Sequence, residues 1–287
     1  MNPANVTIII PAYQEQSAIG EVVSSMATAF PEAEILVIND GSTDRTAAIA
    51  AEAGAVVIEH QFRKGYGAAV CTGVRAATRE YILTCDADGQ HTANEVSRLI
   101  ASSDGFDMVV GARTASSYRP LLRRPGKFIL SRFAEMSLGV KVPDINSGLR
   151  IFRRSVILRY LHLMPRGFSF STTSTFAVLK GHYRYKYIPI ETKKRKGSSS
   201  VRQVVHGPQI ILLMLRLMIL FEPLRFFLFV STLLGAGAAG SLFRDLWTLS
   251  ETGISDTTVI LVVSSLVVFM GGLLCDQISA LRREIHE

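Results

Sequence analysis

The chain has 287 residues, which is enough for one sizeable domain and an appendage. Its 31 basic residues exceed its 24 acidic residues by 31 − 24 = 7, and 48% of all residues are hydrophobic, which is high for a soluble protein. This composition favours a membrane association and an anionic partner such as nucleic acid, acidic lipid or a phosphorylated substrate. The isolated cysteines Cys71, Cys85 and Cys275 lack metal-type spacing, so we interpret them as buried apolar residues in a reducing compartment.

The first part of the chain alternates short apolar runs with helical patterns. The apolar runs predict strands at residues 6–10, 35–40, 56–58, 81–85 and 108–110. The intervening patterns predict helices at residues 17–29, 66–78 and 92–102, and an Ala-rich helix that ends at about residue 53 and has residues 42–44 as its N-terminal cap. Continuous apolar strands separated by helices are typical of a mostly parallel sheet covered on both faces. The sequence therefore predicts a doubly wound α/β domain.

An acidic segment, Asp86-Ala87-Asp88-Gly89-Gln90, follows the apolar run at residues 81–85. Residues i and i+2 of an extended segment point to the same side, so the carboxylates of Asp86 and Asp88 converge just past a strand end. Mg²⁺ or Mn²⁺ relieves the repulsion of two such carboxylates and bridges to substrate phosphates. Ligands of open α/β sheets bind at these strand ends. The segment predicts a metal-diphosphate site, and the alternative is an acidic turn with Gly89 in a left-handed conformation.

Basic segments lie in the middle of the chain. Arg113, Arg123, Arg124 and Lys127 fall in an irregular stretch, after which helical periodicity continues to Leu138. A second basic segment, residues 192–200, contains Arg195 and marks the expected end of the globular domain, which we assign to residues 1–202.

The C-terminal part is much more apolar. We expect an amphipathic helix in the membrane interface at residues 203–225, with Arg216 reaching the head groups. Residues 226–243 and 257–275 carry no charge, and each is long enough to cross a hydrocarbon core of roughly 30 Å. We therefore expect a transmembrane hairpin at residues 226–280, with spans at about 226–243 and 257–276 and a tail at residues 281–287. The alternative is a pair of buried core helices.

The charge pattern predicts the orientation of this hairpin. The link at residues 244–256 carries one basic and three acidic residues, whereas both flanks of the hairpin are basic. The positive-inside rule places both flanks in the cytosol, and the N-terminus has no signal-peptide pattern. We therefore expect an integral membrane protein whose catalytic domain and termini are cytosolic. Gly235, Gly237 and Gly240 suit close packing of spans, within one hairpin or between protomers of a homo-oligomer.

Taken in order, several motifs resemble a known family. Residues 9–15 (Ile-Ile-Pro-Ala-Tyr-Gln-Glu), 37–44 (Val-Ile-Asn-Asp-Gly-Ser-Thr-Asp) and 86–91 (Asp-Ala-Asp-Gly-Gln-His) resemble the inverting family 2 glycosyltransferases of the GT-A fold. Residues 146–150 (Asn-Ser-Gly-Leu-Arg), the basic loop and the paired spans narrow the resemblance to polyprenyl-phosphate glycosyltransferases, the dolichol-phosphate mannose synthase-like branch. The resemblance covers nearly the whole chain. It implies a GT-A domain, which is Rossmann-like, followed by an interfacial helix and a transmembrane hairpin.

The resemblance also implies an activity and a set of site residues. A hexosyl group passes with inversion from a UDP- or GDP-linked sugar to polyprenyl phosphate at the cytosolic membrane face. The implied donor-binding residues are Pro11, Tyr13, Glu15, Asp40, Lys64, Gly65, Asp86, Ser147 and Arg150. Mg²⁺ or Mn²⁺ is held by Asp86, Asp88 and Gln90, and the two aspartates are the catalytic residues because the metal neutralises charge on the departing nucleotide.

Local chemistry supports two of these assignments. The segment Lys64-Gly65-Tyr66-Gly67 precedes a predicted helix, where glycines allow a ligand to approach the backbone and the helix N-terminus favours anions. The implied lipid-phosphate residues are Arg113, Arg123, Arg124, Lys127 and Arg195. Arginine forks suit phosphate oxygens, although a basic face on an anionic membrane has the same composition. The sequence Gly-Ser-Ser-Ser at residues 197–200 lacks the lysines usual in relatives, which weakens a clamp role for this loop.

A phosphate acceptor needs little help from a general base. Its second pKa is near 6, so at neutral pH it is already mostly a nucleophilic anion. Accordingly no histidine stands with a carboxylate in a recognisable catalytic motif, and we expect His91 to be a turn or supporting residue.

Three other functions fit the sequence less well. A processive polysaccharide synthase has more spans and a Gln-x-x-Arg-Trp motif, whereas the single tryptophan here, Trp247, lies in the link between the spans. A non-catalytic binder of nucleotide-sugars or phospholipids is disfavoured by the intact Asp-x-Asp motif. Nucleic-acid binding rests on net charge alone, so no nucleic acid is expected as a partner.

Overall fold

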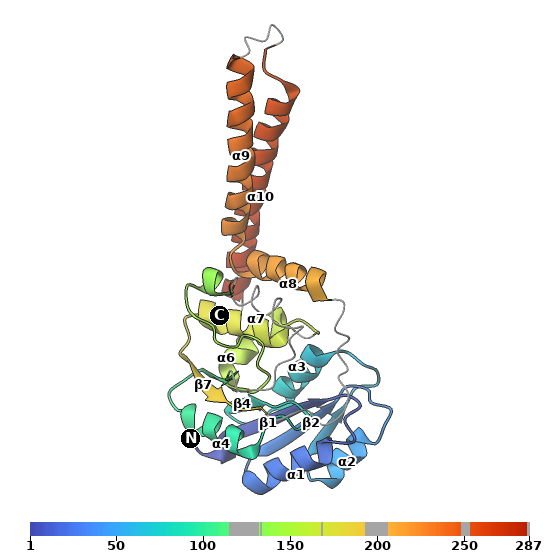
Figure 1. Ribbon diagram of the computed structural model, residues 1–287. Coiled ribbons are helices and arrows are strands. Elements are labelled where there is room, and N and C mark those ends of the chain that lie inside the picture. Colours follow the sequence, from blue (N-terminus) through green and yellow to red (C-terminus); the bar gives the residue numbers. More distant parts are fainter. Residues whose placement is uncertain (115–131, 133, 168, 193–205, 248–252, 286–287) are drawn as a thin grey trace. The chain divides into compact units, whose positions relative to one another are not determined.

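The computed structural model describes residues 1–114, 132, 134–167, 169–192, 206–247 and 253–285 of the chain. The chain forms two compact units, Met1–Ile210 and Ile211–Glu287 (Figure 1). The first unit contains a mixed sheet with helices on both faces, and the second consists of long helices.

In the described part of the first unit, seven strands form one sheet in the order β3-β2-β1-β4-β6-β5-β7. The strands are β1 (Val6–Ala12), β2 (Glu34–Asn39), β3 (Val56–Glu59), β4 (Tyr81–Thr84), β5 (Met108–Arg113), β6 (Arg150–Arg153) and β7 (Tyr185–Ile190). Neighbouring strands are parallel except at β6, which runs antiparallel to both β4 and β5. The expected mostly parallel sheet is confirmed.

Helices cover both faces of this sheet. In the described ranges of the first unit they are α1 (Ile19–Ala29), α2 (Thr46–Glu52), α3 (Tyr66–Ala76), α4 (Ala93–Ser102), α6 (Arg154–Arg159) and α7 (Phe170–Lys180), with short 3₁₀ turns at Pro3–Asn5 and Leu161–Leu163. Side chains alternate along β1: Ile8 and Ile10 join a core cluster with apolar residues of α1 and α4, whereas Ile9 lies against Gly73 of α3. Figure 1 shows α1 and α3 on opposite sides of the sheet.

The structure differs from the sequence-based expectation at α2, β6 and β7. Residues 42–44 were expected to cap α2, but the helix begins at Thr46 with Arg45 as its N-cap residue, and the side chains of residues 42–44 accept hydrogen bonds from Gln14 and Gln16. Strands β6 and β7 were not predicted. The first begins with a buried arginine, and the second alternates half-buried and exposed residues around Pro189, so neither forms a continuous apolar run.

The second unit contains the C-terminal part of α8 (His206–Phe221) together with α9 (Pro223–Trp247) and α10 (Asp256–Ile285). Segments Pro223–Trp247 and Asp256–Leu281 are long and apolar enough to cross a membrane, and their most apolar 18-residue windows have mean hydropathies of 1.8 and 2.5. Only 11% of the most apolar window of each segment is buried. Core helices of a soluble protein are buried, so this exposure supports the expected hairpin of membrane spans.

Small and polar residues join α9 to α10. The Ser265 hydroxyl donates to the Ser231 carbonyl oxygen at 2.8 Å, and a Cβ added at Gly272 would collide with the side chain of Phe227. At the far end, Asp245 accepts hydrogen bonds from the Ser255 amide at 2.9 Å and the Thr258 hydroxyl at 2.8 Å. These contacts help to fix the pairing of the two helices.

The glycines predicted to suit close packing have different surroundings. A Cβ at Gly235 would lie 3.4 Å from Ser265 Oγ, and one at Gly237 would lie 3.7 Å from Leu261. A Cβ at Gly240 would meet no described atom within 4 Å. Gly235 and Gly237 therefore serve the pairing of α9 with α10 within one hairpin.

Candidate active site

The candidate site lies at the carboxyl ends of β1, β2 and β4. These strands are parallel neighbours, and the register pairs Ala12 of β1 with Asn39 of β2 at their last residues. The loops that follow, residues 13–18, 40–45 and 85–92, therefore begin side by side on one edge of the sheet.

Hydrogen bonds join the first two of these loops. The Gln14 amide donates to Ser42 Oγ at 3.0 Å, Gln14 Nε2 donates to Thr43 Oγ1 at 2.7 Å, and the Glu15 amide donates to Thr46 Oγ1 at 2.9 Å. Gln14 has a φ of 57°, which is uncommon for a residue with a side chain. The loop containing Glu15 thus has a defined shape before any ligand arrives.

Tyr13 and Pro11 occupy different environments. The Tyr13 ring is half-buried, and the guanidinium carbon of Arg63 lies 4.1 Å from the ring centroid. This is a cation–π contact at the edge of the site, and Arg63 was not predicted as a site residue. Pro11 is buried inside β1 opposite Ile38, so it shapes the strand end without presenting a polar group to a ligand.

Asp40, expected to contact the base or ribose, is buried and is bound by groups of the protein. It is 3% exposed, and its carboxylate accepts the amide N–H groups of Lys64 and Gly65, each at 2.8 Å. The Nδ1 atom of His60 lies 2.7 Å from Asp40 Oδ1, and His60 Nε2 lies 3.0 Å from Thr72 Oγ1. Asp40 therefore holds the turn before α3 in place.

The glycines of this turn accommodate the chain's own backbone. A Cβ at Gly65, whose φ is +104°, would lie 2.6 Å from the carbonyl oxygen of Arg166, and one at Gly67 would collide with the carbonyl oxygen of Pro165. The amide of Gly67 donates to the Gly167 carbonyl at 3.0 Å, and the amide of Ala68 donates to the Arg166 carbonyl at 3.0 Å. Two N–H groups of the first turn of α3 are thus occupied, which differs from the anion site expected there.

The acidic centre follows β4 as expected. Asp86 is half-buried, with 33% of its side chain exposed, and the Tyr66 hydroxyl donates to its Oδ1 at 3.2 Å. On its other side, a Cβ at Gly148 would lie 2.5 Å from Asp86 Oδ2. Asp88 is 8% exposed and accepts the amide N–H of Gln90 at 3.1 Å.

The protonation states of two neighbours follow from burial. Burial, and then the charge of Asp86, raise the pKa of Tyr66 well above its ordinary value, so the phenol keeps its proton. Burial lowers the pKa of His91 to about 4, although Asp88 acts in the opposite direction. His91 is therefore neutral near pH 7. Its Nδ1 is buried without a hydrogen-bond partner in the described part of the chain, and its Nε2 lies 4.0 Å from Asp86 Oδ2.

The donor atoms of this centre suit a hard divalent cation. Two carboxylates and the half-buried amide of Gln90 are oxygen ligands of the kind that Mg²⁺ and Mn²⁺ prefer. Within the described ranges, no three His, Cys, Asp or Glu side chains gather as a metal site, so the set depends on this amide. Asp86 also lies so close to the Gly148 backbone that a Cβ there would stand 2.5 Å from Asp86 Oδ2, so residue 148 carries no side chain that could block the carboxylate. The residues present fit the expected metal.

Arg113 was expected to bind lipid phosphate, but its guanidinium binds a carboxylate of the protein. Arg113 Nε donates to Asp144 Oδ2 at 2.6 Å, and a terminal nitrogen donates to Asp144 Oδ1 at 3.0 Å. Asp144 is fully buried, and the Arg113 side chain is 30% exposed. The other predicted lipid-phosphate residues, Arg123, Arg124, Lys127 and Arg195, lie outside the described residues.

Ser147 and Arg150 were expected to face the donor, and both are buried. Arg150 is 0% exposed, and its guanidinium donates to carbonyl oxygens of the preceding loop and to polar groups of α7. Its acceptors are the carbonyl oxygens of Ile145, Ser147 and Ser171 and the hydroxyls of Ser174 and Thr175. Arg150 thus supports the loop from inside.

Asn146 is the exposed polar residue in the same loop. Its Oδ1 accepts a hydrogen bond from the Thr172 hydroxyl at 2.6 Å, which turns its amide N–H groups away from α7. The loop is tied to the acidic centre because Thr84 Oγ1 donates to the Gly148 carbonyl at 2.7 Å. Asn146 is therefore a candidate for contacting the nucleotide-sugar, in place of the buried residues Ser147 and Arg150.

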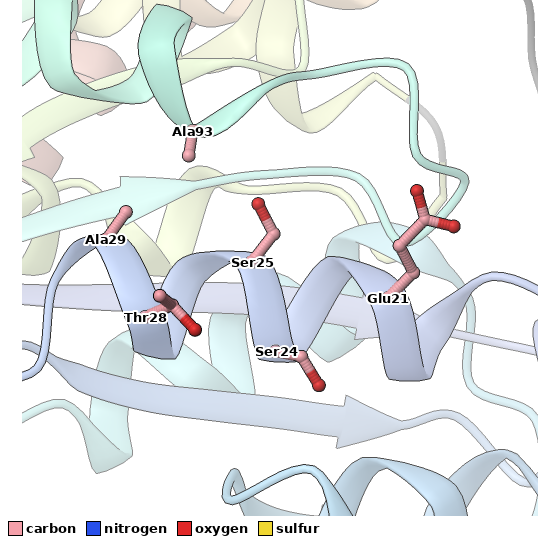
Figure 2. A pocket seen from close by; sticks show the side chains of 6 residues that line it. All are labelled: Glu21, Ser24, Ser25, Thr28, Ala29 and Ala93. Carbon is pink, nitrogen blue, oxygen red and sulfur yellow. The ribbon is translucent and has the colours of Figure 1, made fainter.

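A separate hollow of about 510 Å³ lies between α1 and the start of α4 (Figure 2). It is lined by Glu21, Ser24, Ser25, Thr28, Ala29 and Ala93. These residues are small apart from one acid, and they include neither a cation nor an aromatic ring. A nucleotide diphosphate needs cations near its phosphates, so the strand ends remain the candidate site.

Of the residues that were missed, His60 could have been found from the strand register. The register pairs Asn39 with Glu59, so the next residue after each strand, Asp40 and His60, must be neighbours. A strand-end comparison of β2 with β3 would have found this pair. Asp144 and Tyr66 carry weaker signals, because no strand register brings them to their partners.

Comparisons with known proteins agree with this geometry. The family model described as Glycosyl transferase family 2 matches residues 7–161, and the model described as GtrB C-terminal hairpin matches residues 222–281. An uncharacterized protein of Methanocaldococcus jannaschii is 30% identical over 203 residues, covering 67% of this chain and 83% of that protein. A dolichyl-phosphate hexose transferase of Haloferax volcanii is 29% identical over 209 residues, which cover 72% of this chain and 90% of that protein.

Solved structures share the fold. Glucosyl-3-phosphoglycerate synthase from Mycobacterium tuberculosis, in complex with Mn²⁺, UDP and phosphoglyceric acid, has a TM-score of 0.61 at 18% identity. The match covers 74% of this chain and 78% of that chain. The same enzyme with phosphoglyceric acid alone gives a TM-score of 0.62.

Proposed function

This chain belongs to glycosyl transferase family 2, and from that premise we propose that it transfers a hexosyl group from a UDP- or GDP-linked sugar to polyprenyl phosphate, with inversion. The resemblance drawn from the motifs is confirmed by the family match and by the C-terminal hairpin match. The observation that carries the proposal is the Asp86–Asp88 centre, which lies at the strand ends beside the Tyr13 loop in a chain with two candidate spans. The Haloferax volcanii relative, a dolichyl-phosphate hexose transferase, supports the acceptor class.

The donor nucleotide is proposed to lie along the ends of β1 and β2. Tyr13 offers an aromatic face, Glu15 offers a carboxylate and Lys64 offers an exposed cation. Together these groups suit the base, the ribose and the diphosphate of the nucleotide. Asp40 and Gly65 act through the turn that they hold, and Asn146 is the proposed contact for a sugar hydroxyl. These residues orient the donor, which supplies part of the rate by positioning.

Asp86, Asp88 and Gln90 are proposed to hold Mg²⁺ or Mn²⁺. When bound, such a cation supplies electrostatic stabilisation of the charge that builds up on the departing nucleoside diphosphate. The Mycobacterium tuberculosis enzyme was solved in complex with both Mn²⁺ and UDP, which supports the pairing of metal and nucleotide. The two carboxylates are proposed to supply charged oxygen ligands at the strand end, and the Gln90 amide is proposed to supply a neutral one.

The acceptor phosphate is proposed to be its own nucleophile. It is mostly a dianion at neutral pH, so it needs cations for positioning and no protein base. Arg123, Arg124, Lys127 and Arg195 remain the proposed cations, on chemical grounds alone. The contribution of Arg113 is proposed to be indirect, through the loop that carries its partner Asp144.

The hairpin is proposed to keep the enzyme at the surface that holds its lipid substrate. Confinement to a surface raises the effective concentration of the acceptor. The basic flanks and the acidic link favour an orientation with the catalytic domain and both termini in the cytosol.

A transfer assay tests the proposal. The purified full chain in nanodiscs is incubated with polyprenyl phosphate, Mn²⁺ or Mg²⁺, and a panel of radiolabelled UDP- and GDP-sugars. We expect one donor to yield a labelled, organic-extractable lipid. Absence of labelled lipid across the panel, in protein shown to be folded and to bind a nucleotide-sugar, would favour a non-catalytic binder instead.

A further inference from the structure

One contact joins the start of α3 to the acidic centre. Tyr66 is the first residue of α3, and its hydroxyl donates to Asp86 Oδ1 at 3.2 Å. The phenol therefore reaches a proposed metal ligand from a different element of the fold.

The backbone on both sides of Tyr66 is firmly held. Before it, the amides of Lys64 and Gly65 donate to the buried carboxylate of Asp40, each at 2.8 Å. After it, the amides of Gly67 and Ala68 donate to backbone carbonyls at residues 166–167, each at 3.0 Å. These four hydrogen bonds, two on each side, leave the Tyr66 backbone little freedom, so its hydroxyl has a defined position.

Asp86 is contacted from two different parts of the fold. It lies just after β4, and a third of its side chain is exposed. The Gly148 backbone closes one side of its carboxylate, and that backbone is held by the hydrogen bond from Thr84. The Tyr66 hydroxyl stands at the other oxygen. A carboxylate that lies between a fixed hydroxyl donor and a fixed backbone segment keeps one rotamer more often than a carboxylate without such contacts.

We propose that Tyr66 is a positioning residue for the divalent cation, whose hydroxyl holds the Asp86 carboxylate in the orientation that binds metal. This inference rests on the proposed function, because it takes Asp86 as a metal ligand. The turn before α3, which Asp40 holds in place, would then serve both substrate and metal. It carries Lys64, which is proposed to contact the nucleotide, and Tyr66, which contacts the proposed metal ligand Asp86.

The test compares two substitutions that each remove one phenol oxygen, Tyr66→Phe and Tyr187→Phe. The Tyr187 hydroxyl is buried and has no hydrogen-bond partner in the described part of the chain, so its removal leaves no group unsatisfied. Mn²⁺ binding to the full chain in nanodiscs, with UDP present, is measured from the electron paramagnetic resonance signal of free Mn²⁺. Transfer is measured in parallel as a function of Mn²⁺ concentration.

Supporting partners of metal ligands typically change metal affinity by about 10–100-fold, and we expect Tyr66→Phe to raise the Kd for Mn²⁺ by that amount. The transfer rate of Tyr66→Phe is expected to recover at high Mn²⁺, whereas Tyr187→Phe is expected to match the unmodified chain. A purely structural role for Tyr66 would not produce rescue by metal.

Two results would overturn the inference, and they are distinguishable. If the unmodified chain binds Mn²⁺ and transfers hexose, and Tyr66→Phe binds Mn²⁺ equally well, the positioning role is wrong and the proposed function stands. If the unmodified chain neither binds Mn²⁺ nor transfers hexose, both the metal site and the inference fail.

Discussion

Arg113 and Asp144 form a two-pronged ion pair, with nitrogen–oxygen distances of 2.6 and 3.0 Å. Arg113 ends β5, and Asp144 belongs to the loop before β6, so the pair joins two segments about 30 residues apart. Asp144 is fully buried, and Arg113 is a charged partner that offsets the cost of burying its carboxylate.

The pair predicts that Arg113→Ala destabilises the protein and does not simply weaken lipid binding. Removing one partner of a buried ion pair typically costs about 3–5 kcal/mol, because the remaining charge is uncompensated. We expect a clearly lower midpoint in urea unfolding. The double variant Arg113→Met with Asp144→Leu should recover much of the loss. Wild-type stability in Arg113→Ala would contradict the structural role.

Asp88→Asn is expected to abolish most transfer while preserving the fold. The asparagine oxygen can still accept the amide N–H of Gln90, so the local turn is retained. Loss of a charged metal ligand removes several kcal/mol of transition-state stabilisation, which corresponds to roughly 100-fold or more in rate. The measurement is the transfer rate at saturating Mn²⁺, with thermal unfolding as the control. Full activity with added Mn²⁺ would remove Asp88 from the metal site.

Asn146→Ala is expected to lower kcat/KM for the donor by about 2–10-fold, the worth of one hydrogen bond. Asn146 is exposed, so thermal unfolding should change little. Thr172→Val removes the hydroxyl that holds the Asn146 amide and should produce part of the same effect. Equal kcat/KM in both variants and the unmodified chain would exclude Asn146 as a donor contact.

Gly67→Ala is expected to destabilise the first unit by about 1–3 kcal/mol, the usual cost of overpacking. The added methyl would collide with the Pro165 carbonyl oxygen, which belongs to the backbone and has little room to move. Gly167→Ala is the matched control, because a Cβ there meets no described atom within 4 Å. Urea unfolding of both variants tests this, and similar midpoints would show that the close approach at Gly67 carries no cost.

The strands were predictable where apolar residues run continuously. β1, β2 and β4 are buried on both faces, so their sequences carry an unbroken apolar signal. β6 has no such signal, since Arg150 opens it and is buried only because the loop and α7 supply acceptors for its guanidinium. That arrangement depends on tertiary contacts, and local sequence patterns do not contain them.

The position of Asp86 and Asp88 after β4 was predictable for a related reason, because the acidic segment directly follows an apolar run. The environments of Asp40, Arg113 and Arg150 were not predictable in the same way. Each was expected to meet a ligand, and each meets groups of the protein that lie at least 20 residues away in the chain. A motif thus predicts which residues gather at the site, whereas which of them contact a ligand depends on the long-range partners.

The position of β6 between β4 and β5 bears on how this protein is made. While the ribosome has released only the residues up to β5, β4 has β1 on one side and an open edge on the other. An unpaired apolar edge is a template for wrong pairing with another chain. An unfinished sheet of this kind would carry the acidic loop at residues 85–92 until Arg150–Arg153 pairs with β4. Chaperones that cover strand edges would have their main task in this interval of synthesis.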